Sequence, residues 1–324
     1  MTTMLDRRPG PSPSSGQSAS AQLTGRWRGR WRRTTTREAG AAWVMLTPAI
    51  VLLAWWFVTP IVQSVVLSFQ QVSKFRFDER TFVGLQNYSE LFADDAFRRS
   101  LGITATFVLF VVPAQTVLAI LVAATLQGVA RGRTLFRTVF FVPYMTSTVA
   151  ITTIFMQLFV KGGPVSSTLA RFGTPDVTWY ADTGMALIFL VIVYVYMFVG
   201  LYIVIFVGGM ESIPASLYEA ATMDGAGVVR RFWHVTLPGL RPYAVFVVVA
   251  GVIQAIQVFD QAYVISGGTV LGSPAGATST IVVFIYQQAF RLNAIGYGSA
   301  ATVVLLATVI IAGVISRRIA PKEA

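Results

Sequence analysis

Four polar side chains interrupt the apolar segment 241–264 near its C-terminal end, and their types suit hydrogen bonding to a solute. They are Gln254, Gln257, Asp260 and Gln261, spaced three, three and one residues apart. Side-chain amides donate and accept hydrogen bonds, and a carboxylate accepts them. On a helix this spacing places most of the four along one face. Asp260 and Gln261 lie near the end of the segment, where polar residues also suit a membrane interface.

Aromatic rings offer a second kind of contact. Tyr194, Tyr196 and Tyr202 lie in or near the apolar segment 184–208, and a tyrosine ring can stack on the face of a sugar. Aromatic residues in membrane helices also serve as packing groups or interface anchors, so both interpretations stay open. The predicted path for a solute comprises Gln254, Gln257, Asp260, Tyr194 and Tyr196.

Residues that would indicate catalysis are missing from the sequence. The chain has no Cys, and its single His, His234, has no acidic or histidine cluster beside it. None of the three lysines follows a glycine, so the G-x-x-x-x-G-K-[ST] loop that binds phosphate is absent. We find no carboxylate, histidine or metal-ligand cluster in the apolar segments. The prediction is a chain that is not an enzyme and binds neither a metal nor a cofactor itself.

A charged insert, YEAATMDGAGVVRRFWHVTLPGLRP, occupies residues 218–242 between two of these segments. Ser212 and Pro214 predict a helix start, because a hydroxyl cap followed by proline is typical of a first turn. The glycines at 225 and 227 predict the end of that helix, which gives a helix over 215–223 and a second one over 228–235. The small residues Ala220 and Ala221 leave room for another protein to approach the first helix closely.

The elements that carry these residues are membrane spans. Hydrophobic residues make up 55% of the 324-residue chain and charged residues only 12%, with a mean hydropathy of +0.66, whereas an ordinary soluble domain is about 25% charged. A span needs about 20 apolar residues. Six segments qualify, at 42–68, 101–127, 134–159, 184–208, 241–264 and 297–316. We therefore predict an all-α membrane protein whose transmembrane domain covers 42–320, with a loop at 209–240.

The basic residues indicate the orientation. The net charge is +11, and 17 of the 25 Lys and Arg residues belong to the N-terminal tail, the second and fourth connections and the C-terminus. Positively charged segments stay in the cytoplasm, so both termini and the insert are predicted to be cytoplasmic. Residues 1–41 are Pro/Ser/Gly-rich and then Arg/Trp-rich, which predicts a disordered basic tail. Its Trp and Arg residues could bind an anionic lipid surface. Basic residues scattered between spans do not favour nucleic-acid binding.

The insert resembles a known sequence motif. Glu219-Ala220-Ala221, then Gly225, then Val235-x-Leu237-Pro238 is similar to the EAA loop of permease subunits of binding-protein-dependent ABC importers. The likeness continues over 47–69, 82–92, 136–159 and 259–300, where the chain resembles the first permease subunit of the carbohydrate and glycerol-3-phosphate uptake branch.

This resemblance implies a bundle like that of type I ABC importer permeases, in a bacterial cell membrane. It implies coupling to a separate ATPase through Glu219, Ala220, Ala221, Asp224, Gly225, Leu237 and Pro238. It also implies a second permease, two ATPase subunits that hold ATP and Mg²⁺, and a substrate-binding protein that the outer connections 69–100, 160–183 and 265–296 receive. Uptake of a sugar or a related polyol or glycerol-phosphate compound would proceed by alternating access.

An ion-coupled secondary transporter of a small polar solute is the alternative. Such a carrier requires acidic or histidine relays near the middle of the membrane, and usually inverted repeats. Only Asp260 is available for a relay, and no repeat of fixed period occurs. The substrate stays open among a neutral sugar, an oligosaccharide, glycerol 3-phosphate and a glycerophosphodiester. The lack of an obvious intramembrane pocket of Lys or Arg for phosphate favours the neutral sugar, although a partner permease could supply the charge.

Overall fold

The computed structural model describes residues 36–72, 80–127, 133–268 and 270–319, and almost all of its regular structure is helical. The chain divides into two compact units, residues 1–60 and 61–324. Most of the predicted tail lies outside the described residues. Its last residues, from Thr36, already belong to a helix.

An apolar helix begins the described chain. It consists of α2 (Thr36–Leu53), a π-helical turn η1 (Ala54–Val58) and α3 (Thr59–Ser68). The Thr59 amide donates to the Ala54 carbonyl five residues back. Pro60 follows directly and has no amide to donate, so the widened turn lies where the ordinary helical hydrogen bonds are interrupted.

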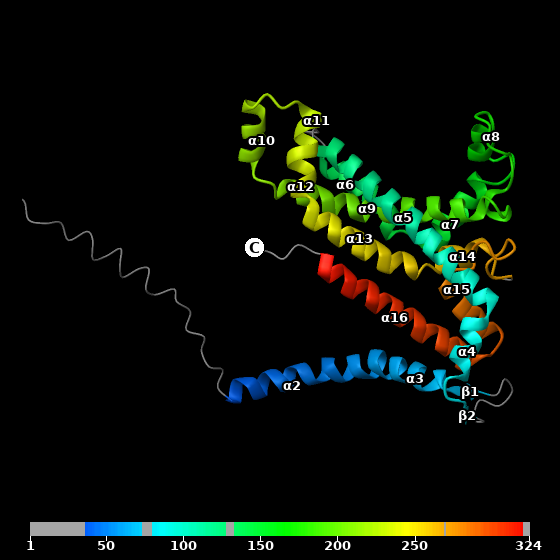
Figure 1. Cartoon of the computed structure of the whole chain (residues 1–324). Coiled ribbons are helices and arrows are strands. Elements are labelled where there is room, and N and C mark those ends of the chain that lie inside the picture. Colours follow the sequence, from blue (N-terminus) through cyan, green and yellow to red (C-terminus); the bar gives the residue numbers. More distant parts are fainter. Residues whose placement is uncertain (1–35, 73–79, 128–132, 269, 320–324) are drawn as a thin grey trace, which may run out of the picture. The chain divides into compact units, whose positions relative to one another are not determined.

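The other spans belong to the second unit (Figure 1). Five described helices are long and apolar enough to cross a membrane, or six when a bent pair counts as one span. The helices that follow the first are α5 (Asp95–Gln127), the pair α6 (Arg133–Met145) and α7 (Thr148–Leu158), α9 (Ala186–Glu211), α13 (Arg241–Ile256) with α14 (Asp260–Ile265), and α16 (Ile295–Ile319). The six predicted spans are confirmed. The difference is that the third is bent by 96° between α6 and α7.

Short elements connect the spans. Strands β1 (Gln70–Val72) and β2 (Arg80–Phe82) pair antiparallel, with Gln70 opposite Phe82. The short helices are α4 (Gln86–Ala93), α8 (Pro164–Ala170), η2 (Trp179–Ala181), α15 (Ile281–Tyr286) and η4 (Gln287–Arg291). The insert folds into α10 (Ala215–Met223), α11 (Val228–Arg231), η3 (Phe232–Thr236) and α12 (Leu237–Gly239). In Figure 1, α10 and α11 lie at one end of α9 and α13, and α14 lies at the other end.

Helix α9 is the centre of the core of this unit. It is apolar on all sides, as expected of a helix that neighbours surround, and it packs against α5, α6 and α13. Phe189, Leu190, Ile203 and Phe206 are fully buried. Of all the spans, α9 therefore has the least surface left for lipid or a partner.

A glycine sets the closest approach of α9 to α6. A Cβ added at Gly200 would overlap the backbone carbonyl of Phe140. Small residues at helix crossings are typical of membrane proteins, because packing rather than the hydrophobic effect holds such helices together. The Gly200 crossing thus fixes the position of the span that leads directly into the insert.

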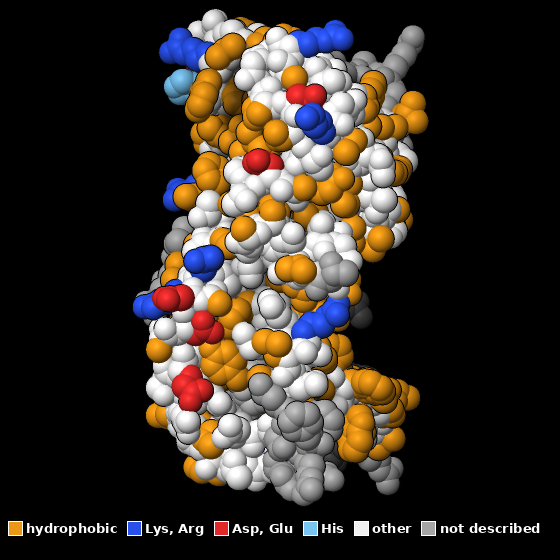
Figure 2. Space-filling view, turned by 90° about the vertical axis from the view of Figure 1, so that its right-hand side faces the viewer, with side chains coloured by type: hydrophobic (Ala, Val, Ile, Leu, Met, Phe, Trp, Pro, Cys, Tyr) orange, Lys and Arg blue, Asp and Glu red, His pale blue; other side chains and the backbone are white. Residues whose placement is uncertain are grey.

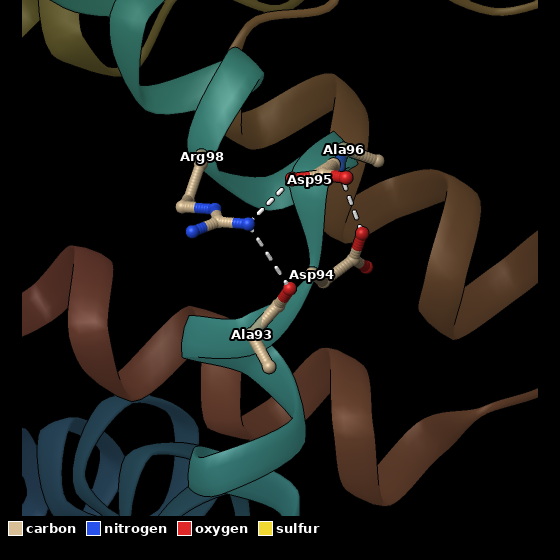
Figure 3. Close-up of polar contacts among 5 residues, drawn as sticks. All are labelled: Ala93, Asp94, Asp95, Ala96 and Arg98. Carbon is tan, nitrogen blue, oxygen red and sulfur yellow. Dashed lines mark hydrogen bonds and ion pairs between the residues drawn. The ribbon is translucent and has the colours of Figure 1, made fainter.

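Asp94 joins three elements at the start of α5. Its Oδ1 accepts a hydrogen bond of 2.7 Å from the Ala96 amide, and its Oδ2 accepts one of 2.8 Å from the Tyr297 hydroxyl of α16. Next to it, Arg98 donates to the Asp95 carboxylate and to the Ala93 carbonyl (Figure 3). Asp94 therefore caps α5 and holds α16 with one carboxylate.

Candidate functional site

The insert exposes part of its sequence motif. Glu219 and Ala220 on α10 are exposed, and Ala221 is half-buried. Large apolar side chains also face outward from the insert: Leu217, Met223, Val228, Val229 and Trp233. No residue of α10 is buried. A helix without buried residues gains little stability from its own chain, and exposed apolar surface of this kind is typical of a contact site for another protein.

The end of α10 is formed as the sequence predicts. Gly225 has a φ of +73°, and the amides of Gly225 and Ala226 donate to the carbonyls of Thr222 and Ala221. This arrangement needs a left-handed residue after the helix, which glycine adopts without a steric penalty. Gly225 therefore turns the chain from α10 toward α11.

The predicted cap at the start of α10 is wrong. Pro214, not Ser212, precedes the first helical residue, and no side chain caps the helix. The Ser212 hydroxyl instead donates to the Gly209 carbonyl and accepts a 3.0 Å hydrogen bond from Tyr243. A serine hydroxyl bonds readily to a carbonyl three residues back, so Ser212 ends α9 rather than starting α10.

The second helix of the insert does not end at residue 235 as predicted, because Leu237 and Pro238 continue it. Helix α11 continues through the π turn η3 into α12. The Leu237 amide donates to the Phe232 carbonyl five residues back, directly before a proline that cannot donate. Leu237 is half-buried and Pro238 exposed, so they lie on the connection to α13 and not on α10.

Contacts at its base attach the insert to three spans. Arg137 of α6 pairs with Glu211 of α9 at 2.5 Å, and Tyr243 of α13 bonds to Ser212. Within the insert, the Tyr218 hydroxyl lies 3.0 Å from Thr236 Oγ1, and Arg231 donates to Thr222 Oγ1 at 2.9 Å. These contacts connect α10 to the second helical segment of the insert, and they connect the chain just before α10 to α6 and α13.

A small polar hollow lies on the insert between its helices. Its volume is about 210 Å³, and its lining includes Asp224, Arg230, Arg231 and His234. In Figure 2 the histidine and nearby Lys and Arg side chains lie at the upper end of the face shown, beside hydrophobic ones. The surface near the predicted motif thus carries basic groups that suit an acidic partner surface.

The polar residues of the fifth span meet at a cavity. Gln254, Gln257 and Asp260 line a hollow of about 310 Å³ together with Tyr194 of α9. The other lining residues are Thr148, Phe198, Val258, Phe259 and Gln261. The structure therefore brings together four of the five residues of the predicted path.

The fifth residue, Tyr196, lies elsewhere. It is exposed and lines a separate, mostly apolar hollow of about 570 Å³ against α5 and α6. Its ring packs 4.9 Å from that of Phe155. Residues two positions apart on a helix point in directions about 200° apart, so Tyr194 and Tyr196 cannot both face one narrow cavity.

Two broken spans form the cavity, and no single helical face does. Helix α13 ends at Ile256 and α14 begins at Asp260, while α6 ends at Met145 and α7 begins at Thr148. Residues at both breaks line the hollow, and α7 packs against α14. Irregular backbone at membrane depth occurs where it lines a cavity or is buried in protein, and broken helices are typical of binding sites in transporters. Sequence reasoning missed Thr148. The three consecutive hydroxyl residues Thr146, Ser147 and Thr148 within an apolar segment could have indicated a polar lining there.

Six apolar spans, one of them bent, together with a charged insert and a polar hollow define a class of membrane transport protein. The match to known families agrees with this. Residues 115–323 match the model of the family described as binding-protein-dependent transport system inner membrane component, and the chain belongs to that family.

Its relatives are permease proteins. The chain is 33% identical to the probable ABC transporter permease protein YurN of Bacillus subtilis, over 82% of this chain and 91% of that one. It is 28% identical to the arabinooligosaccharides permease AraP of the same organism, over 89% and 91%. With the sn-glycerol-3-phosphate permease UgpA of Escherichia coli O157:H7 it shares 30% identity, over 88% and 96%. The chain is thus a permease subunit of an ABC importer of the carbohydrate and glycerol-3-phosphate type, and ATP hydrolysis belongs to a separate chain.

Solved structures share the fold. A bacterial alginate ABC transporter in complex with an alginate pentasaccharide-bound periplasmic protein contains a chain that matches with a TM-score of 0.74 and 20% identity, over 89% of this chain and 98% of that one. The predicted permease fold is therefore confirmed.

Proposed function

We propose that this chain is one of two permeases of an ATP-driven importer that takes up a sugar or a related polyol or glycerol-phosphate compound. A substrate-binding protein delivers the solute to the outer connections. The solute then passes the polar cavity between the broken spans while the bundle alternates between outward and inward access. The exposed helix α10 carries this proposal, because it presents the Glu219-Ala220-Ala221 motif on a surface that no other part of the described chain covers.

The coupling residues divide into a contact group and a hinge group. Glu219, Ala220, Ala221 and Asp224 form the surface that meets the ATPase, and Gly225 sets the turn behind it. Leu237 and Pro238 connect the insert to α13, where their helical geometry supports transmission rather than contact. ATP and Mg²⁺ are bound by the partner ATPase.

The cavity supports the assignment of a hydrogen-bonding solute. Three amides and a carboxylate line it, and the Tyr194 ring adds an aromatic wall. Sugar hydroxyls need such partners, because each buried hydroxyl left unpaired costs about 1–3 kcal/mol. The relatives named for arabinooligosaccharides and sn-glycerol 3-phosphate carry hydroxylated solutes of this kind.

An affinity purification tests the coupling. The tagged chain is isolated from membranes in mild detergent as wild type, as Glu219→Lys and as Glu90→Lys, a charge reversal of an exposed glutamate on α4. We expect a second permease and an ATPase with the wild type and the control, and loss of the ATPase with Glu219→Lys.

Two results would contradict the proposal. A wild-type chain that is isolated alone in several mild detergents would contradict the assembly. Solute uptake by the chain in vesicles without any ATPase would favour the ion-coupled carrier, which needs no such partner.

A further inference from the structure

A second layer of polar groups lies behind the cavity. Tyr202 of α9 is only 1% exposed and does not line the hollow. Its hydroxyl donates a 2.9 Å hydrogen bond to Oε1 of Gln254, which does line it. Tyr202 therefore acts on the cavity through Gln254 and not by contact with a solute.

Gln115 and Gly251 lie close to the Tyr202 hydroxyl. Gln115 of α5 is fully buried, and neither atom of its amide has a hydrogen-bond partner in the described part of the chain. A Cβ added at Gly251 of α13 would overlap Gln115 Nε2 and lie 3.6 Å from the Tyr202 hydroxyl. Three spans thus cross at a group of polar side chains, which is costly within a membrane unless it serves a function.

These contacts fix the direction of the cavity amides. Because the Tyr202 hydroxyl donates to Oε1 of Gln254, it orients this amide, and the amide nitrogen of Gln254 can donate to a solute. Gln257 is oriented by a different bond, since its Nε2 donates one hydrogen to the Ile253 carbonyl at 3.1 Å, and its oxygen can accept from a solute. Asp260 adds a carboxylate, which only accepts.

A donor beside two acceptors suits a hydroxyl group. A hydroxyl accepts from Gln254 and donates to Gln257 or Asp260, whereas phosphate and carboxylate groups only accept. None of the nine residues that line the cavity is Lys, Arg or His, so nothing in the lining offsets the Asp260 charge. An anionic solute would meet like charge at Asp260.

We propose that Tyr202 orients Gln254 so that the cavity selects neutral, hydroxyl-bearing solutes over phosphate esters and uronates. This inference rests on the proposed function, because it concerns the substrate of the same cavity. The relatives do not decide it, since their names cover arabinooligosaccharides and lactose as well as sn-glycerol 3-phosphate. Tyr202 is a positioning residue in this scheme.

The test uses the assembled importer, purified with its second permease and ATPases. Equilibrium binding of three radiolabelled probes is measured without the binding protein: lactose, sn-glycerol 3-phosphate and an alginate disaccharide. We expect lactose to bind at least tenfold more tightly than either anion. Asp260→Asn should reduce the preference for lactose over the anions severalfold, because the amide removes the negative charge and adds hydrogen-bond donors.

The Tyr202→Phe variant tests the positioning role. It should raise the Kd for lactose about five- to tenfold, as expected for one lost oriented hydrogen bond. Tyr297→Phe is the matched control, because it also removes a tyrosyl hydrogen bond, to Asp94, but outside the cavity lining. Thermal unfolding of both variants separates a loss of stability from a loss of binding.

Different results overturn different claims. Equal or tighter binding of either anion by the wild type, or identical lactose Kd values for the two Phe variants, would overturn the selectivity inference and leave the importer standing. A separate experiment tests the proposed function. It measures ATP-driven uptake of solute in proteoliposomes with the binding protein added. Failure of the wild type to take up solute of any class would refute the proposed function, and the inference with it.

Discussion

Gly225 shows how one backbone angle shapes the contact surface. Its φ of +73° lies in a region that costs other L-residues about 1–2 kcal/mol. The glycine has open space around its Cα, so a side chain there meets no neighbour and only the angle matters. The position of α10 relative to α11 depends on this turn.

Gly225→Ala should therefore uncouple the ATPase from transport. We expect the ratio of solute transported to ATP hydrolysed to fall severalfold in proteoliposomes, because the turn behind α10 is strained. Gly227→Ala is the matched control, since Gly227 also has open space but a φ of −67°. An equal effect of the two substitutions would count against the role of the angle.

Asp94 and Asp95 are neighbours with different roles (Figure 3). Asp94→Ala should lower stability by about 1–2 kcal/mol, because it removes a helix cap and leaves the Tyr297 hydroxyl without its acceptor. Asp95→Ala should lower stability by less than about 1 kcal/mol, because it removes only a surface ion pair in which Asp95 is 88% and Arg98 61% exposed. Thermal unfolding in detergent measures both, and similar losses would refute this difference.

At the scale of elements, the crossing of α6 and α9 is the most sensitive contact. Gly200→Ala should destabilise the bundle by about 1–3 kcal/mol or prevent folding, because its methyl group would overlap the Phe140 carbonyl. Gly208→Ala, on the same helix with nothing nearby, should be neutral. Size-exclusion profiles and unfolding temperatures compare the two, and a stable Gly200→Ala bundle would exclude the tight crossing.

The sequence predicts elements better than breaks within them. The six spans and the helix over 215–223 follow from apolar length and helix-stop residues, which are local signals. The bend at Thr146–Ser147 and the interruption at Gln257–Phe259 depend on tertiary packing, so the pattern at 254–261 looked like one helical face. Ser212 was assigned to the wrong helix because a hydroxyl can bond forward to amides or backward to carbonyls. Tyr196 was grouped with Tyr194 on residue type alone, without regard to direction.

At the scale of the whole molecule, orientation in the membrane remains a prediction that the absence of Cys makes easy to test. Single substitutions Met223→Cys on the insert and Lys161→Cys on an outer connection place one thiol at exposed positions. We expect a membrane-impermeant maleimide to label Lys161→Cys in intact cells and Met223→Cys only in inverted vesicles. The opposite pattern would reverse the topology.

The interrupted spans also determine what the cavity contains when it holds no solute. The first amides of α7 have no partner within their helix, and Ser147 provides no side-chain cap. Such groups need a hydrogen-bond partner, so we expect water in the hollow where no solute is present. Each solute that enters must displace this water. A polyhydroxylated molecule replaces the lost hydrogen bonds and passes with little penalty, whereas an apolar molecule of the same size leaves them unmade.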